Sequence, residues 1–152
     1  MEFSVQIDGL DRIDKASQRV RDAVAKEVAI GLFASAKKVE GEAKRSILSG
    51  DKSGRIYQRR TVTHRASAPG EAPASDTGRL ANSITGTYVP SETSAVITAG
   101  GGIVKYARML EFGTRLIAAR PFLFPALEKS KAWIRERLNK AVRTAIVGVL
   151  RG

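Results

Sequence analysis

The strongest constraint on the fold is an uninterrupted helical pattern that runs from about residue 10 to residue 48. Its first half carries an apolar stripe at spacings of seven, four and four, formed by Ile13, Val20, Val24 and Val28. After Gly31 the stripe shifts to Leu32, Ala36, Val39 and Ala43. A helix of this length measures about 55 Å at 1.5 Å per residue, which exceeds what one small core can cover. We therefore expect part of this helix to contact another subunit.

The stretch from Ala29 to Ala34 is apolar around its whole circumference. Two interpretations fit it equally well. It is an interface with another subunit, or it is buried beneath the chain's own sheet.

A second long helix is predicted at the C-terminus. One face carries Leu127, Ile134, Leu138, Val142, Ala145 and Val149. Trp133 falls about 120° away from that face at 100° per residue. It either packs against the edge of a sheet or contacts another subunit, since aromatic residues are enriched in interface cores.

The middle of the chain is predicted to be a loop followed by a hairpin. Residues 49–78 contain many glycines and prolines and no sustained period, so we expect a mobile basic loop with a short strand near residues 61–63. Asp76 is expected to cap a short helix over residues 77–83. Two strands over 84–89 and 94–99 follow, joined by a turn.

Together with an alternating strand at Phe3, Val5 and Ile7, these elements predict one α+β domain spanning residues 1–152. Its long N-terminal and C-terminal helices would pack on a small, mainly antiparallel sheet.

The segment from Tyr106 to Leu127 holds a helix end, a tight connector and a second helix start. About two helical turns lead to Gly113, which is expected to close the helix in the left-handed conformation. Glu111 and Arg120 flank the connector, and we expect a bidentate ion pair between them to fix the two helices. The alternative is that both charges are simply solvated.

Two pieces of the chain carry a family resemblance. The downstream piece comprises Tyr106-Ala107, Glu111-Phe112-Gly113-Thr114, Ala119-Arg120-Pro121-Phe122-Leu123 and Pro125-Ala126-Leu127. The upstream piece comprises residues 67–73, Asp76-Thr77-Gly78, Leu80 and Ser83-Ile84. In this combination and order, the chain resembles the tail-component family of tailed bacteriophages, which includes relatives of the minor tail protein Z of lambda-like phages.

The resemblance implies a virion structural protein of a phage or prophage, active in tail completion and head-to-tail joining at the neck. Copies would be made in the bacterial cytoplasm and would assemble, as a ring around the tail axis, with neighbouring neck and tail proteins. The assembly residues it indicates are Tyr106, Glu111, Phe112, Gly113, Thr114, Arg120, Pro121 and Phe122, and Trp133 joins them as a candidate contact.

A net charge of +11 supports a rival interpretation, because such a chain is attracted to polyanions at low salt. The excess is concentrated in the loop and in the C-terminal helix. The loop places one aromatic among arginines, a composition typical of phosphate contact and base stacking, at Arg55, Tyr57, Arg59, Arg60 and Arg65. The alternatives are a solvated loop, a DNA contact within a virion, and a free-standing basic nucleic-acid-binding protein.

Catalysis is the least supported class. The chain has no cysteine, and its one histidine, His64, has no nearby carboxylate at a spacing that would orient it, so we expect an exposed loop residue. We expect no enzyme activity, cofactor or metal site. No apolar run approaches the roughly 18 residues of a membrane span, and the N-terminus does not have the pattern of a secretory signal, so no membrane association is expected.

Overall fold

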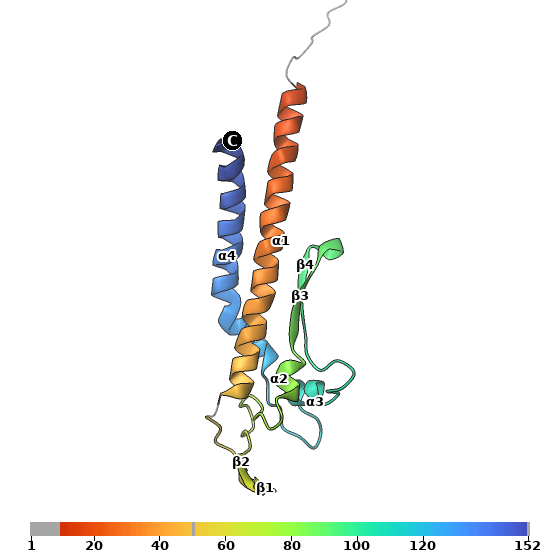
Figure 1. The fold of residues 1–152 in the computed structure, drawn as a ribbon, viewed down its shortest axis with the longest axis vertical. Helices are drawn as coiled ribbons and strands as arrows, with labels where there is room; N and C mark the ends of the chain where they lie inside the picture. The colour runs from red at the N-terminus through yellow and green to blue at the C-terminus, as the bar shows by residue number, and fades with distance from the viewer. Residues whose placement is uncertain (1–9, 50, 152) are drawn as a thin grey trace, which may run out of the picture.

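Two antiparallel helices form the long axis of the molecule. The computed structural model describes residues 10–49 and 51–151. Helix α1 (Leu10–Leu48) is a single helix, as predicted, and α4 (Leu123–Arg151) runs beside it in the opposite direction. The N-terminal end of α1 extends beyond the C-terminal end of α4 (Figure 1). None of the described helices has an apolar stretch long enough to cross a membrane.

Small residues bring the two helices together. The buried residues of α4 are Ala126, Ser130, Ala141 and Ala145. A Cβ atom added to Gly31 of α1 would lie 3.0 Å from Leu138 Cδ2 and 3.6 Å from Ala141 Cβ, so the glycine permits this close approach. The predicted apolar face of α4 therefore meets α1, with one correction. Leu127 is 37% exposed, because the buried stripe passes through Ala126 instead.

The predicted hairpin after residue 84 is confirmed. Strands β3 (Thr85–Val89) and β4 (Ser94–Thr98) pair antiparallel from Thr85 opposite Thr98 to Val89 opposite Ser94, and a 3₁₀ turn, η1 (Pro90–Glu92), joins them. The hairpin lies along α1 (Figure 1). At the contact, Gly86 N–H donates to Glu40 Oε2 at 2.8 Å.

The core lies where α1, the short helix α2 (Arg79–Asn82) and the start of α4 meet. Its largest fully buried side chains are Phe122, Ile47, Ile84 and Val39. The fold is α+β, as expected, although the four strands within residues 10–49 and 51–151 form two separate two-stranded sheets.

The basic loop is more regular than predicted. Strands β1 (Ile56–Arg59) and β2 (Val62–Arg65) form an antiparallel hairpin at the end of the molecule below α1 (Figure 1). The expected short strand near residues 61–63 is thus one half of a hairpin. The expected mobility of residues 49–78 stays a prediction.

Asp76 does not cap a helix, which corrects a second expectation. Helix α2 begins after Gly78, whose φ of 73° is favourable for glycine, and none of the described side chains caps it. The Asp76 carboxylate instead faces the hairpin, where it pairs with Arg59.

The apolar stretch over residues 29–34 is only partly buried. Gly31 is buried against α4, whereas Ile30 and Phe33 remain 45% and 48% exposed. The Lys37 ammonium lies 5.7 Å from the centre of the Phe33 ring. Burial therefore does not account for Ile30 and Phe33, and the interface interpretation stays a prediction. The expected strand at residues 3–7 lies outside the described residues.

Glu40 makes the contact between α1 and β3 dependent on pH. Its carboxylate accepts hydrogen bonds from Lys37, Lys44 and the Gly86 amide, and the lysines in particular lower its pKa from 4.5 to about 2. A lowered pKa in the folded state stabilises the fold above pH 4.5, and this stabilisation is lost as the pH falls towards 2.

We therefore expect the free energy of unfolding, measured in urea, to decrease between about pH 4.5 and pH 2. The decrease should be smaller in a Glu40→Gln variant, which retains the other carboxylates. Identical pH profiles for the two proteins would contradict this role of Glu40.

A candidate assembly site at the corner between α3 and α4

The downstream motif forms a corner between two helices. Helix α3 (Ala107–Phe112) follows Tyr106 and buries Ala107 in the core. Its outer side is apolar and exposed, with Met109 at 48% and Phe112 at 77%. Tyr106 itself is 44% exposed. The short helix is thus anchored by Ala107 and by Leu110, which packs against the core, while it presents Met109 and Phe112 to solvent.

Glu111 caps the start of α4. Its Oε2 accepts the backbone N–H groups of Phe122 and Leu123 at 2.9 and 3.0 Å, and its Oε1 accepts that of Phe124 at 2.8 Å. These amides have no partner within the helix, and Pro125, the next residue, has no N–H group. A carboxylate is also favoured by the positive end of the helix dipole. One side chain on α3 thereby fixes where α4 begins.

The predicted ion pair between Glu111 and Arg120 is wrong. Both carboxylate oxygens are directed at the amides of α4, and no ion pair joins Glu111 to Arg120 in the described part of the chain. Arg120 donates from Nε to the Ser67 carbonyl at 3.2 Å and from Nη1 to the Ala118 carbonyl at 3.3 Å. Glu111 does not need Arg120 as a partner, because the free N–H groups at the start of a helix attract a carboxylate directly.

Arg120 connects the two pieces of the chain that carry the resemblance. Its side chain donates to the Ser67 carbonyl of the upstream piece. Next to it, the Ala119 carbonyl accepts the Gly70 N–H at 2.9 Å. Glu71 in the same loop accepts hydrogen bonds from the Ser53 hydroxyl and from the N–H groups of Ala68 and Ser53, and these bonds lower its pKa to about 2. The loop over residues 67–71 is therefore held against the connector of the corner.

The connector over residues 113–119 is a compact loop. Gly113 has φ 73° and ψ 178°, so its φ is positive as predicted, but it does not adopt the left-handed helical conformation. A Cβ there would lie 2.9 Å from Ala119 N and Ile117 O, so a side chain does not fit. Thr114 closes the loop, since its N–H donates to the Ile117 carbonyl and its Oγ1 accepts two amides.

An open apolar groove of about 560 Å³ lies beside this corner, and we call it the corner groove. Its lining residues are Val39, Ile97, Ala99, Ala107, Arg108, Glu111, Phe112, Pro121, Phe122, Leu123, Phe124 and Leu127. Several of them belong to the core, so the floor of the groove is rigid. The exposed rings of Phe112 and Phe124, the latter 63% exposed, stand at its margin.

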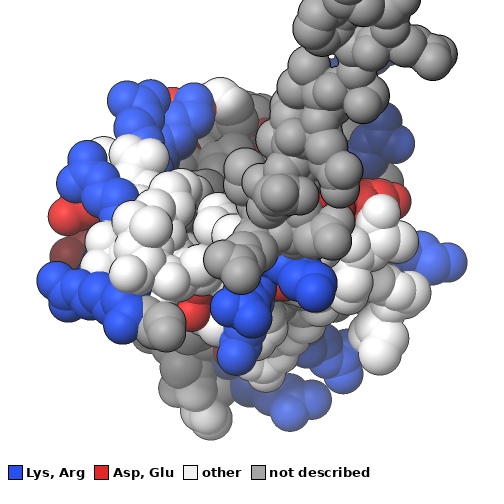
Figure 2. Space-filling view, turned by 90° about the horizontal axis from the view of Figure 1, so that it is seen from above, with Lys and Arg blue, Asp and Glu red and all other residues white. Residues whose placement is uncertain are grey.

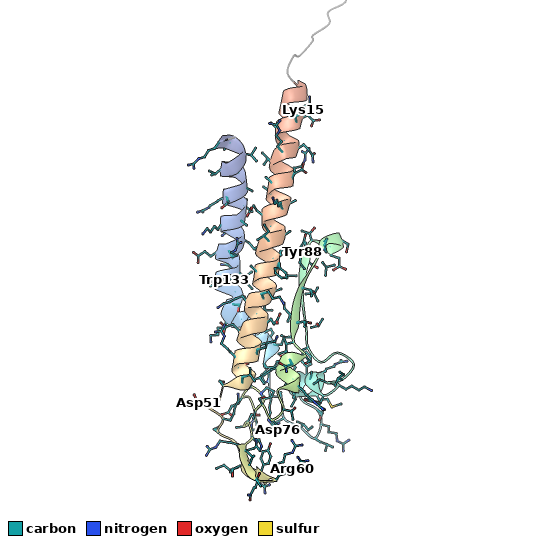
Figure 3. The ribbon with its side chains drawn as sticks, viewed as in Figure 1. Lys15, Asp51, Arg60, Asp76, Tyr88 and Trp133 are labelled. Atoms are coloured by element: carbon teal, nitrogen blue, oxygen red, sulfur yellow. The ribbon has the colours of Figure 1, made fainter. Side chains whose placement is uncertain are left out.

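The structure brings together four of the predicted assembly residues, Glu111, Phe112, Pro121 and Phe122, in this groove. Phe122 is 1% exposed and belongs to the core, so its role is structural. Trp133 lies elsewhere, on the side of α4, where Lys38 of α1 lies 6.0 Å from its ring (Figure 3).

Sequence reasoning did not select Arg108, Phe124 or Leu127 as site residues. Phe124 and Arg108 lie within the segment from Tyr106 to Leu127, and this position in the sequence was the signal that could have identified them as site residues. Ile97 and Ala99 come from β4, and no local pattern links that strand to the corner.

The predicted nucleic-acid residues lie on the β1–β2 hairpin. Arg60 occupies the turn at the end of the molecule opposite Lys15 (Figure 3), with a φ of 55°. Arg59 pairs with Asp76, whereas no described carboxylate pairs with Arg55, Arg60 or Arg65. Three of the four predicted arginines are thus exposed on the hairpin without an acidic partner.

His64 is not the solitary loop residue that was expected. It lies on β2 with its ring stacked on Tyr57 at a centroid distance of 5.7 Å. Its Nε2 lies 3.6 Å from Asp76 Oδ1. Asp76 is distant in sequence, which is why spacing gave no indication of it. The cluster holds the hairpin against the loop that follows it.

The described residues contain no group of three or more acidic or histidine side chains arranged to hold a metal ion. Comparison of the chain with protein-family models, with curated proteins and with solved structures finds no match. The functional conclusion therefore depends on the geometry of the corner and of the hairpin.

Proposed function

We propose that this chain is a structural protein of a tailed-phage virion, located at the head-to-tail junction, where copies assemble with one another and with neighbouring neck and tail proteins. The observation that carries the proposal is the corner groove. It combines exposed aromatic rings with a floor formed by the core, and contiguous exposed apolar surface of this kind is typical of protein interfaces.

The rigidity of the corner supports an assembly role. Glu111 fixes α4 to α3, and Arg120 fixes the upstream loop to the connector. A surface held in this way loses little conformational entropy when a partner binds. The exposed Ile30 and Phe33, on the part of α1 beside α4, offer a separate contact surface. A subunit with two separate contact surfaces can bind another copy through one of them and a neighbouring neck or tail protein through the other.

Deletion of the gene tests this proposal. Electron microscopy of the lysate should show separate DNA-filled heads and tails, or tails with a faulty end. Complementation should succeed with the wild-type gene and with Ile103→Ser, which changes an exposed side chain outside the groove, and fail with a Phe112→Ser/Phe124→Ser variant. Normal joined and infectious particles from the deletion strain would refute the proposal.

The β1–β2 hairpin favours a second candidate function, a free-standing basic nucleic-acid-binding protein. The hairpin presents Arg55, Arg60 and Arg65 beside the Tyr57 ring. By contrast, Figure 2 shows lysine and arginine side chains spread around the helical end of the molecule. The hairpin is therefore the more concentrated site for contact with phosphates.

Charge reversal of the hairpin tests this second function. Each phosphate contact contributes a slope of about −0.9 to the dependence of log affinity on log salt for duplex DNA. We expect Arg55→Glu/Arg60→Glu/Arg65→Glu to make that slope shallower by about 3 units, as measured by fluorescence anisotropy. The control, Lys15→Glu/Arg19→Glu/Lys26→Glu, changes the net charge equally on exposed positions of α1.

Equal slopes for the two variants would show attraction by net charge alone and would contradict a hairpin site. Binding by the wild-type protein that persists at physiological salt would favour the free-standing function.

A further inference from the structure

The corner groove is apolar inside, and its lining includes one basic side chain, Arg108. Residues 100–120 carry four basic side chains and one acidic one. The acidic one is Glu111, whose carboxylate accepts hydrogen bonds from three amides of α4. One of the basic ones, Arg120, donates to two backbone carbonyls. The remaining cations are Lys105, Arg108 and Arg115, none of which forms an ion pair with another described residue. Arg108 lines the groove itself.

An unpaired strand edge borders the same groove. Strand β4 pairs only with β3 among the described residues, so its other edge has unpaired backbone groups. The groove is lined by Ile97 at the end of β4 and by Ala99 just after it, and by no residue of β3. An extended segment can add to such an edge through main-chain hydrogen bonds while its side chains enter adjacent pockets.

We propose that the corner groove binds an extended segment of a different protein, apolar on the side that enters the groove and acidic where it meets Arg108. This inference rests on the proposed function, because it names the kind of partner that the assembly site takes. Aromatic or leucine side chains would contact Phe112 and Phe124, and a carboxylate would pair with Arg108.

The charge of the chain argues against a second copy as the occupant. The protein carries +11, and residues 51–80, 81–120 and 121–152 each contain at least twice as many basic as acidic side chains. Residues 1–50 are nearly balanced, with nine basic and eight acidic side chains. Residues 1–14 carry four acidic side chains and one basic one, but each copy brings this segment with a net charge of +11, so like-charge repulsion between whole chains disfavours a second copy as the occupant.

Selection from a random peptide library displayed on yeast tests the proposal on the intact protein. We expect the peptides enriched by the wild-type protein to combine acidic with aromatic or leucine residues. The affinity of the most enriched peptide should fall about tenfold with Arg108→Glu, the effect of losing one favourable charge pair, and at least as much with Phe112→Ser. The control Arg135→Glu reverses an exposed charge on the outer side of α4 and should leave affinity unchanged.

Three outcomes would overturn the proposal. The first is that the enriched peptides lack acidic residues. The second is that the Arg108→Glu and Arg135→Glu variants bind these peptides with equal affinity. A third is a wild-type oligomer in sedimentation velocity that Phe112→Ser dissociates, which would identify a second copy as the occupant. Thermal unfolding followed by circular dichroism establishes that each variant is folded. Arg108 and Phe112 are both exposed at the margin of the groove, so we expect their substitution to leave the fold intact.

The two proposals fail separately. Peptide selection uses the isolated protein, so a negative result leaves the phenotype of the deletion strain intact. Conversely, normal particles from the deletion strain would refute the virion role while acidic peptides still bind the groove.

Discussion

Replacing Glu111 with alanine is expected to lower the free energy of unfolding by about 3 kcal/mol. The change leaves the amides of Phe122, Leu123 and Phe124 without their acceptor and removes a negative charge from the start of α4. For a chain of this size, the midpoint of thermal unfolding should fall by roughly 6–12 °C. Glutamine retains one acceptor oxygen without the charge, so the free energy of unfolding of the Glu111→Gln variant should lie between those of the wild type and of Glu111→Ala.

Glu128→Ala is the matched control on the same helix. Glu128 is exposed and pairs with Lys131 one turn later, and such surface pairs contribute at most about 0.5 kcal/mol. Both variants can be measured by urea denaturation at neutral pH. Equal stabilities for Glu111→Ala and Glu128→Ala would show that the capping bonds contribute no more than a surface ion pair.

The long helices could be predicted because their information is local. Apolar residues recur at helical spacing over many turns, and no proline interrupts residues 10–48. The hairpin of β3 and β4 likewise has a local turn signal between two alternating segments. The β1–β2 hairpin has no alternating apolar face, since all four residues of β1 are exposed, so its sequence resembled a loop.

The site was predicted only in part. Glu111 was correctly placed at a helix end, but the partner was assigned by charge rather than by the unbonded amides of the next helix. Arg120 was assigned to that pair, whereas it bonds Ser67, a residue 53 positions away. The corner groove depends on Ile97 and Val39, which reach it from β4 and α1. Such contacts are set by tertiary packing, and sequence periodicity does not encode them.

The contact between β3 and α1 leads to the second large expected effect. A Cβ at Gly86 would lie 2.6 Å from the Ala36 carbonyl oxygen and 3.0 Å from the Ala36 Cβ. Atoms of a helix backbone cannot move aside, so Gly86→Ala must push the hairpin away from α1. That shift would also lengthen the hydrogen bond from the Gly86 N–H to Glu40. We expect the free energy of unfolding to fall by about 3 kcal/mol, at the upper end of overpacking effects.

Gly148→Ala is the informative comparison, because an added Cβ there meets no atom of the described residues within 4 Å. Inside a helix, alanine is favoured over glycine by roughly 0.5–1 kcal/mol, so this variant should be slightly more stable than wild type. Replacing glycine with alanine is thus expected to lower the free energy of unfolding at position 86 and to raise it slightly at position 148, as measured by urea denaturation. A Gly86→Ala protein as stable as wild type would mean that the hairpin does not rest on α1 at this distance. The apolar groove, whose wall includes the end of β4, would then have a different shape.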